Sequence, residues 1–134
     1  MATANVLTCK PAEDGNEVQC GLQVSARREE LAQQFADAGL KIVGIHEARS
    51  RKARRVTVCQ FDMLASASLK GCGGTELWLH EDPHAGLDKP IVQSNDHPHL
   101  LATVPLPSGA ANCFVTHAPC EPKNDEERAR NQSW

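Results

Sequence analysis

The chain has 134 residues, of which 40% are hydrophobic, and its formal net charge is -3 at pH 7. This length allows one domain with its own core, and the slightly acidic balance argues against a protein that coats nucleic acid or a membrane surface through bulk charge. No apolar run approaches the length of a transmembrane helix, and residues 1–7 lack the features of a signal peptide. We therefore expect an intracellular protein that does not insert into membranes.

The first third of the chain predicts a strand, a helix and a second strand. Residues 2–7 form a short apolar run that favours a strand. Ser25 is a suitable N-cap and Gly39 a suitable C-terminal stop, so we expect a helix from about Ser25 to Ala38. The apolar run at 41–45 is rich in β-branched residues and predicts a buried strand, of the kind found in layered folds.

The rest of the chain predicts short strands separated by turns that contain Gly and Pro. A consecutive strand, turn and strand indicates an antiparallel pair, and the last two expected strands form a hairpin. The pattern therefore predicts an α+β fold, with one mixed and mostly antiparallel sheet covered on one face by the helix. The expected strands are 56–63, 75–80, a short one at 91–92, 100–104 and 112–117.

Two charged residues near these elements are expected at the surface. Arg28 is assigned to the outer face of the helix. Glu76 alternates with Leu77 on the strand 75–80, so it is expected to face solvent, with a role as a second site acid as the alternative.

Glu47 follows the buried strand directly and is the first candidate for chemistry. A carboxylate at the end of a rigid strand can hold a metal ion or a proton, and the cations behind it would attract phosphate groups. The alternative is a strand that ends at the surface, followed by a solvated basic loop. The seven residues 49–55 contain five cations, namely Arg49, Arg51, Lys52, Arg54 and Arg55.

Four short motifs occur in an order that resembles the endonuclease/exonuclease/phosphatase superfamily, which includes pancreatic deoxyribonuclease and abasic-site endonucleases. The family has an Asn on its first strand, a Glu with a nearby Arg after a buried strand, a Gly-x-x-Leu-Trp-like strand and a strand that ends in a His-Ala-Pro-like sequence. The matching segments are Thr3-Ala4-Asn5-Val6, His46-Glu47-Ala48-Arg49, Gly74-Thr75-Glu76-Leu77-Trp78 and Val115-Thr116-His117-Ala118-Pro119.

The resemblance implies hydrolysis of a phosphodiester or phosphomonoester, with nucleic acid as the expected substrate and Mg²⁺ or Mn²⁺ as the cofactor. It makes Glu47 the metal ligand. It makes His117 and Asn5 catalytic residues, with His117 stabilising the phosphate or donating a proton to the leaving oxygen. Arg49, Arg51 and Lys52 would bind the phosphates of the substrate.

The same resemblance implies that residues 1–134 are a partial domain, the first half of a four-layer α/β-sandwich. The family's Gly-Asp-x-Asn segment and terminal Asp-His pair do not follow His117 in this sequence. With the C-terminal half absent, we expect little activity from the chain as given. We also expect one apolar sheet face to be exposed, which could drive self-association.

Two other classes of function remain open. The first is a catalytically dead remnant that binds nucleic acid or protein. The second is a small intracellular zinc module, although no C-x-x-C pair or other common zinc spacing occurs. Its candidate ligands are Cys72, His80, His84, His97, His99 and Cys113.

Overall fold

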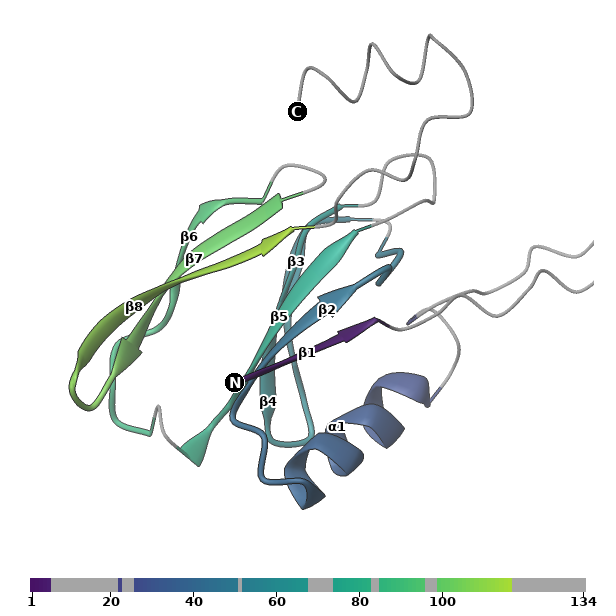
Figure 1. The fold of residues 1–134 in the computed structure, drawn as a ribbon, viewed down its shortest axis with the longest axis horizontal. Coiled ribbons are helices and arrows are strands. Elements are labelled where there is room, and N and C mark those ends of the chain that lie inside the picture. Colours follow the sequence, from purple (N-terminus) through teal and green to yellow (C-terminus); the bar gives the residue numbers. More distant parts are fainter. Residues whose placement is uncertain are drawn as a thin grey trace, which may run out of the picture.

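The computed structural model of the chain describes residues 1–5, 22, 26–50, 52–67, 74–82, 85–95 and 99–116. They form three layers, in which the helix α1 (Arg27–Asp37) packs on one face of a five-stranded sheet and a three-stranded sheet packs on the other (Figure 1). The α+β class predicted from the sequence is therefore confirmed. In the described part of the chain, every helix is too short or too polar to cross a membrane.

The larger sheet is mixed, with the strand order β1-β2-β5-β4-β3. Its first two strands run parallel, and the other neighbouring pairs are antiparallel. The smaller sheet has the order β6-β7-β8 and is antiparallel throughout. The strands are β1 (Ala2–Asn5), β2 (Ile42–His46), β3 (Arg54–Val58), β4 (Phe61–Ala65), β5 (Thr75–His80), β6 (Ile91–Ser94), β7 (His99–Leu106) and β8 (Gly109–Thr116).

The helix α1 ends where the sequence predicts. Gly39 has a φ of 69°, and the next amide, that of Leu40, donates a hydrogen bond of 2.9 Å to the carbonyl of Phe35. This is the pattern of a helix closed by a left-handed glycine. At the other end, Ala26 precedes the helix and caps it with no side-chain hydrogen bond. Ser25, the predicted N-cap, lies outside the described residues.

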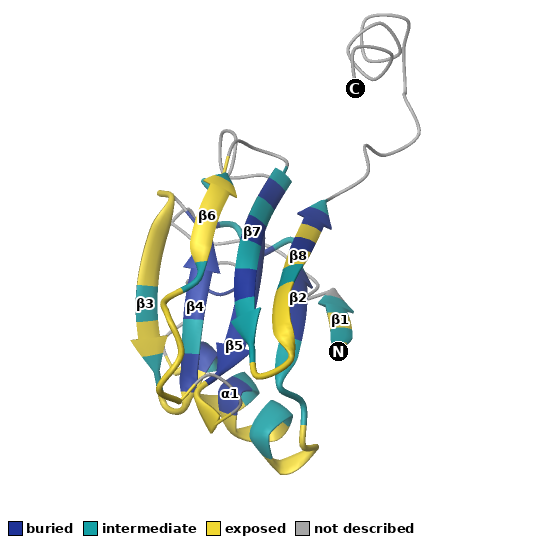
Figure 2. Cartoon of the chain, turned by 90° about the vertical axis from the view of Figure 1, so that its left-hand side faces the viewer, coloured by how far each residue is buried: buried dark blue, intermediate teal, exposed yellow. Residues whose placement is uncertain are grey.

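Two apolar clusters hold the three layers together. Between α1 and the larger sheet, Trp78 packs edge-on against Phe35 at a ring distance of 5.7 Å and also contacts Phe61. Between the two sheets, Leu77 and Leu79 of β5 lie in one cluster with residues of β4, β7 and β8. Figure 2 shows the result on β7, where buried positions alternate with partly exposed ones.

This second cluster corrects the expectation of a single sheet with one bare apolar face. The strands expected at 91–92, 100–104 and 112–117 form a sheet of their own, and that sheet covers the face in question. Sequence periodicity predicts strands but does not say which strands pair, so it indicates a single sheet where the described residues form two.

One expected strand is two strands. Residues 54–65 form the hairpin of β3 and β4, in which Val58 pairs with Phe61 across a two-residue turn at Cys59 and Gln60. Cys59 adopts a φ of 51°, although neither turn residue is a typical turn former. The hairpin of β7 and β8 is confirmed, and only two residues connect its strands.

Candidate functional site

The parallel pairing of β1 and β2 brings two of the predicted site positions to one edge of the larger sheet. Asn5, the last residue of β1, lies directly opposite His46, the last residue of β2, and Glu47 follows. The carboxyl ends of parallel strands share an edge, as the arrows in Figure 1 show. The structure describes the backbone of Asn5 and not its side chain.

The strand β8 ends on the same side of the molecule. A Cβ added to Gly44 of β2 would lie 3.4 Å from Cγ2 of Val115, so the end of β8 packs on β2. Figures 1 and 2 both show β8 running in the same direction as β1. His117 follows β8 in the sequence and lies outside the described residues.

The backbone after β2 is strained in a way that is often found at functional sites. Glu47 has a φ of 59° and Arg49 a φ of 54°, a left-handed conformation that costs free energy for any residue except glycine. Ala48, between them, is fully buried, and its N–H donates to the carbonyl of Gly74 at 3.1 Å. Its own carbonyl accepts from the N–H of Leu22 at 3.3 Å. Two backbone hydrogen bonds thus hold the chain at Ala48, and a residue with a strained backbone lies on each side of it.

The Glu47 carboxylate is accessible and lies next to a cation. Its side chain is 20% exposed, and Oε2 lies 3.9 Å from Nε of Arg49. A half-buried oxygen ligand of this kind suits a hard divalent cation that keeps most of its water. Within the described ranges, no three His, Cys, Asp or Glu residues gather in a way that could hold a metal.

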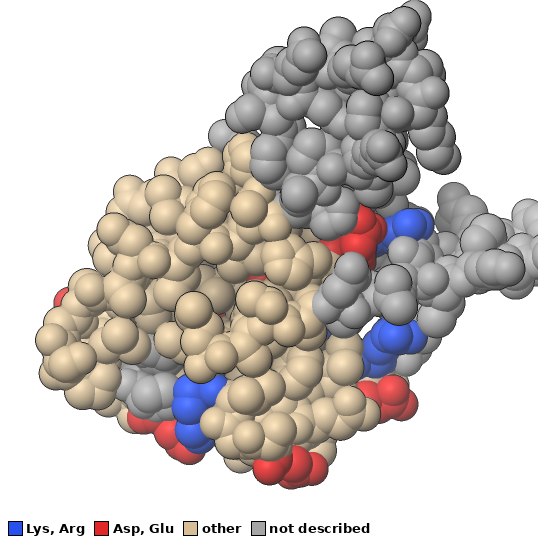
Figure 3. All heavy atoms as spheres, in the orientation of Figure 1, with Lys and Arg blue, Asp and Glu red and all other residues tan. Residues whose placement is uncertain are grey.

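Two cations of the predicted cluster lie beside carboxylates in the part of the chain that the structure describes. Arg49 is paired with Glu47, and Arg55 binds Asp62 through two of its nitrogens, with Nε at 2.9 Å. Lys52 and Arg54 are exposed, and Arg51 lies outside the described residues. On the face shown in Figure 3, the described positive side chains are scattered and lie near negative ones.

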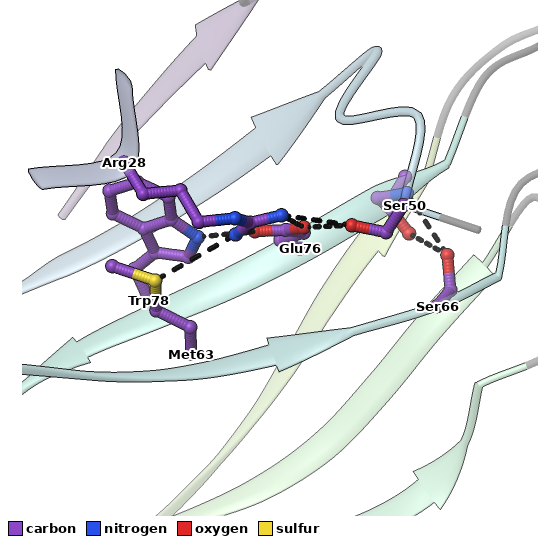
Figure 4. Close-up of polar contacts among 7 residues, drawn as sticks. Arg28, Ser50, Met63, Ser66, Glu76 and Trp78 are labelled. Atoms are coloured by element: carbon purple, nitrogen blue, oxygen red, sulfur yellow. Dashed lines mark hydrogen bonds and ion pairs between the residues drawn. The ribbon is translucent and has the colours of Figure 1, made fainter. Parts of the chain in front are cut away.

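A buried ion pair lies beside this site, and the sequence analysis missed it. Glu76 is fully buried and Arg28 is 8% exposed, so both surface assignments are wrong. The Arg28 guanidinium binds the carboxylate with both terminal nitrogens, at 2.6 and 2.7 Å. Trp78 adds a hydrogen bond from Nε1 at 2.7 Å (Figure 4). Helical spacing could have indicated the burial of Arg28, which precedes Ala32 by four residues and shares its buried face.

Ser50 connects this pair to the loop that carries Glu47. Its side chain is buried, and its hydroxyl donates a short hydrogen bond to Oε1 of Glu76. The same hydroxyl accepts a hydrogen bond of 3.0 Å from Nη2 of Arg28. Figure 4 shows Arg28 and Ser50 meeting at the carboxylate from different parts of the chain.

The residues of the alternative zinc module are separated where the structure describes them. Cys113 faces the core between the sheets, and this burial raises the pKa of its thiol. His99 stacks on the exposed ring of Phe114, on the other face of the smaller sheet. His80 lies in the larger sheet and bonds to Gln60. The remaining candidates, Cys72, His84 and His97, lie outside the described residues.

No protein-family model matches this chain, and no curated protein is significantly similar to it in sequence.

Proposed function

We propose that the chain supplies part of a site for Mg²⁺-dependent hydrolysis of phosphoesters, with nucleic acid as the substrate class, inside the cell, and that it has little activity on its own. The observation that carries this proposal is the register of the parallel strands β1 and β2. It places Asn5 opposite His46 and beside Glu47, at the side of the molecule where β8 also ends. The family resemblance makes Asn5 a catalytic residue and Glu47 a metal ligand.

Each residue then has a role that suits its chemistry. Glu47 supplies one carboxylate ligand to Mg²⁺ or Mn²⁺, and the bound cation neutralises charge on the phosphoryl group. The amide of Asn5 supports this site without adding negative charge. His117 stabilises the phosphate or donates a proton to the leaving oxygen. Arg49, Arg51 and Lys52 contact neighbouring phosphates through salt-sensitive ion pairs.

Localised paramagnetic broadening by Mn²⁺ tests the metal assignment directly. In a ¹⁵N-labelled sample, Mn²⁺ should broaden the amide signals of Asn5, Glu47 and Thr116 before those of other residues. Glu47→Gln should abolish this pattern. The matched control is Glu81→Gln, which makes the same change in an exposed residue beyond the end of β5, at the opposite edge of the sheet. Broadening that is unchanged in Glu47→Gln would refute the proposed metal ligand.

A second candidate function is a nucleic-acid-binding module without catalysis. The exposed cations Lys52 and Arg54 favour it, together with the lack of a three-ligand group among the residues that the structure describes. Neutralising one phosphate-binding cation should reduce the salt dependence of binding by about one unit of slope. Fluorescence anisotropy with single-stranded and double-stranded DNA, for the wild type and Lys52→Gln/Arg54→Gln, measures this slope. Binding whose salt slope is the same in both proteins would rule out these two cations as phosphate ligands.

A further inference from the structure

Hydrogen bonds from two buried residues hold the loop after β2 in place. The first is Ala48, whose backbone bonds to Gly74 and Leu22. The second is Ser50, which is 2% exposed and bonds to the buried pair of Arg28 and Glu76. The loop therefore alternates between residues fixed in the interior and residues directed to the accessible side.

Each oxygen of the Glu76 carboxylate accepts two hydrogen bonds. Oε1 accepts from Arg28 and from the hydroxyl of Ser50, and Oε2 accepts from Arg28 and from the indole of Trp78. These donors come from α1, from the loop after β2 and from β5 itself. A bidentate arginine contact sets both the distance and the plane of the carboxylate. The network thus defines where the Ser50 hydroxyl must lie.

Stability does not by itself account for such a network. Replacing a buried ion pair by apolar side chains of similar volume is often neutral or stabilising, because removing two charges from water is costly. A buried ion pair can instead select one arrangement of the side chains around it. Here that arrangement includes Ser50, at the end of the strained loop.

We propose that Arg28, Ser50 and Glu76 are positioning residues of the candidate site. They hold the loop so that Glu47 and Arg49 keep their left-handed backbone and Glu47 presents its carboxylate to a divalent cation. The metal part of this inference rests on the proposed function. The loop part rests on the observed hydrogen bonds alone, and the experiment reads the two separately.

The loop readout is amide hydrogen exchange at Ala48, whose N–H is buried and bonded to Gly74. Ser50→Ala should accelerate this exchange by at least about tenfold, the factor expected for losing a hydrogen bond to a charged group. The matched control is Ser66→Ala, which removes an equally buried hydroxyl that bonds to Thr75 instead. This control should leave the Ala48 exchange rate near that of the wild type.

A triple variant, Arg28→Met/Ser50→Ala/Glu76→Leu, separates positioning from folding. It removes the network without leaving a charge buried, although the Trp78 indole loses its acceptor, so it should still unfold cooperatively in urea, at a higher concentration than Arg28→Ala. Its Ala48 amide should nevertheless exchange at least about tenfold faster. Wild-type protection of Ala48 in the folded triple variant, or in Ser50→Ala, would overturn the proposal.

The metal readout is Mn²⁺ affinity, measured by electron paramagnetic resonance. Ser50→Ala should weaken binding by at least about threefold relative to the wild type and to Ser66→Ala, since positioning residues act through geometry. Equal affinities in all three proteins, where the wild type binds and Glu47→Gln does not, would overturn the positioning of the metal ligand. Absence of Glu47-dependent binding in the wild type would refute the proposed function, while the exchange rates would still decide the loop inference.

Discussion

Gly44 of β2 and Val115 of β8 meet where the two sheets pack, and a Cβ on Gly44 would lie 3.4 and 3.5 Å from the two methyl carbons of Val115. One added methyl group therefore just fits, and a larger side chain does not. This contact keeps the end of β8 close to β2, and so it shapes the side of the molecule where the candidate site lies.

Gly44→Ala should change the free energy of unfolding by less than about 1 kcal/mol, because crowding against Val115 offsets the gain from a less flexible unfolded chain. Gly44→Val should lower it by about 1–3 kcal/mol, because the extra methyl groups must displace Val115. Urea denaturation of both variants measures these changes. A Gly44→Val variant as stable as Gly44→Ala would show that the sheets can move apart at this point.

The buried ion pair should respond very differently to single and double substitution. Arg28→Ala leaves the fully buried carboxylate of Glu76 without its counter-charge, which should lower the free energy of unfolding by about 3–5 kcal/mol. Arg28→Met/Glu76→Leu should lower it less, by about 1–3 kcal/mol, because neither charge remains and the cost is that of the buried donors of Trp78 and Ser50, which lose their acceptor. Urea unfolding at pH 7 compares the two. A double variant as unstable as the single one would mean that the pair makes a net contribution to stability.

Sequence predicts structure well in this chain where a single residue decides the local conformation. The end of α1 was predicted because Gly39 takes a φ of 69° that other residues avoid. The turn at Cys59 was missed because Cys59 adopts a φ of 51° without any turn signal in the sequence. Residues 56–63 consequently looked like one strand. Sequence patterns therefore predict a helix end or a turn only where the residue in the left-handed conformation is one that commonly adopts it, as Gly39 is and Cys59 is not.

The burial of Glu76 could not be predicted from its own strand. Alternation with Leu77 separates the two faces correctly, but it does not say that both faces are covered. The partner Arg28 lies 48 positions earlier, so their contact is a property of the tertiary fold. The common edge of Asn5 and Glu47 likewise follows from the parallel pairing of β1 and β2, a pairing that the sequence pattern did not specify.

An exposed ion pair gives a prediction about pH. A hydrogen bond from Lys41, at 3.1 Å, and the charge of Lys41 hold the pKa of Asp82 below its ordinary value of 3.8. A depressed carboxyl pKa adds stability that is present above the unfolded-state value and is lost as pH falls through the folded-state value. Any contribution of this pair should therefore disappear only below about pH 4, and it should be small because both side chains are exposed.

Lys41→Met should return the pKa of Asp82 toward 3.8, which a ¹³C NMR titration of the Asp82 carboxyl carbon can follow. The comparison variant is Lys52→Met, which removes an exposed lysine from the loop before β3. It should leave the titration of Asp82 unaltered. If Asp82 titrates identically in Lys41→Met and in the wild type, the cause assigned to its low pKa is wrong.

The final prediction concerns catalysis by this chain itself. Supercoiled plasmid incubated with the chain and Mg²⁺ or Mn²⁺ should be nicked at the background rate only. Glu47 is the one carboxylate proposed as a metal ligand, and a single carboxylate should hold Mg²⁺ weakly, since Mg²⁺ gives up its water reluctantly. In addition, the Asp-His pair of the family that the sequence resembles does not follow His117 in this sequence. Loss of one catalytic acid or base typically lowers the rate by about 10²- to 10⁴-fold, and imperfect positioning of the reacting groups can lower it further.

The matched proteins for this assay are Glu47→Ala and His117→Ala, purified in parallel with the wild type. We expect all three proteins to nick the plasmid equally and only at the background rate. Such equal nicking would come from trace contaminating nucleases and not from the chain. Robust nicking by the wild type that both substitutions abolish would contradict the prediction. That outcome would show that Glu47 and His117 act in one site and that this site is sufficient for phosphodiester hydrolysis. Titrating the protein concentration would then separate a single chain from two cooperating copies, since the rate of a paired site rises with the square of concentration.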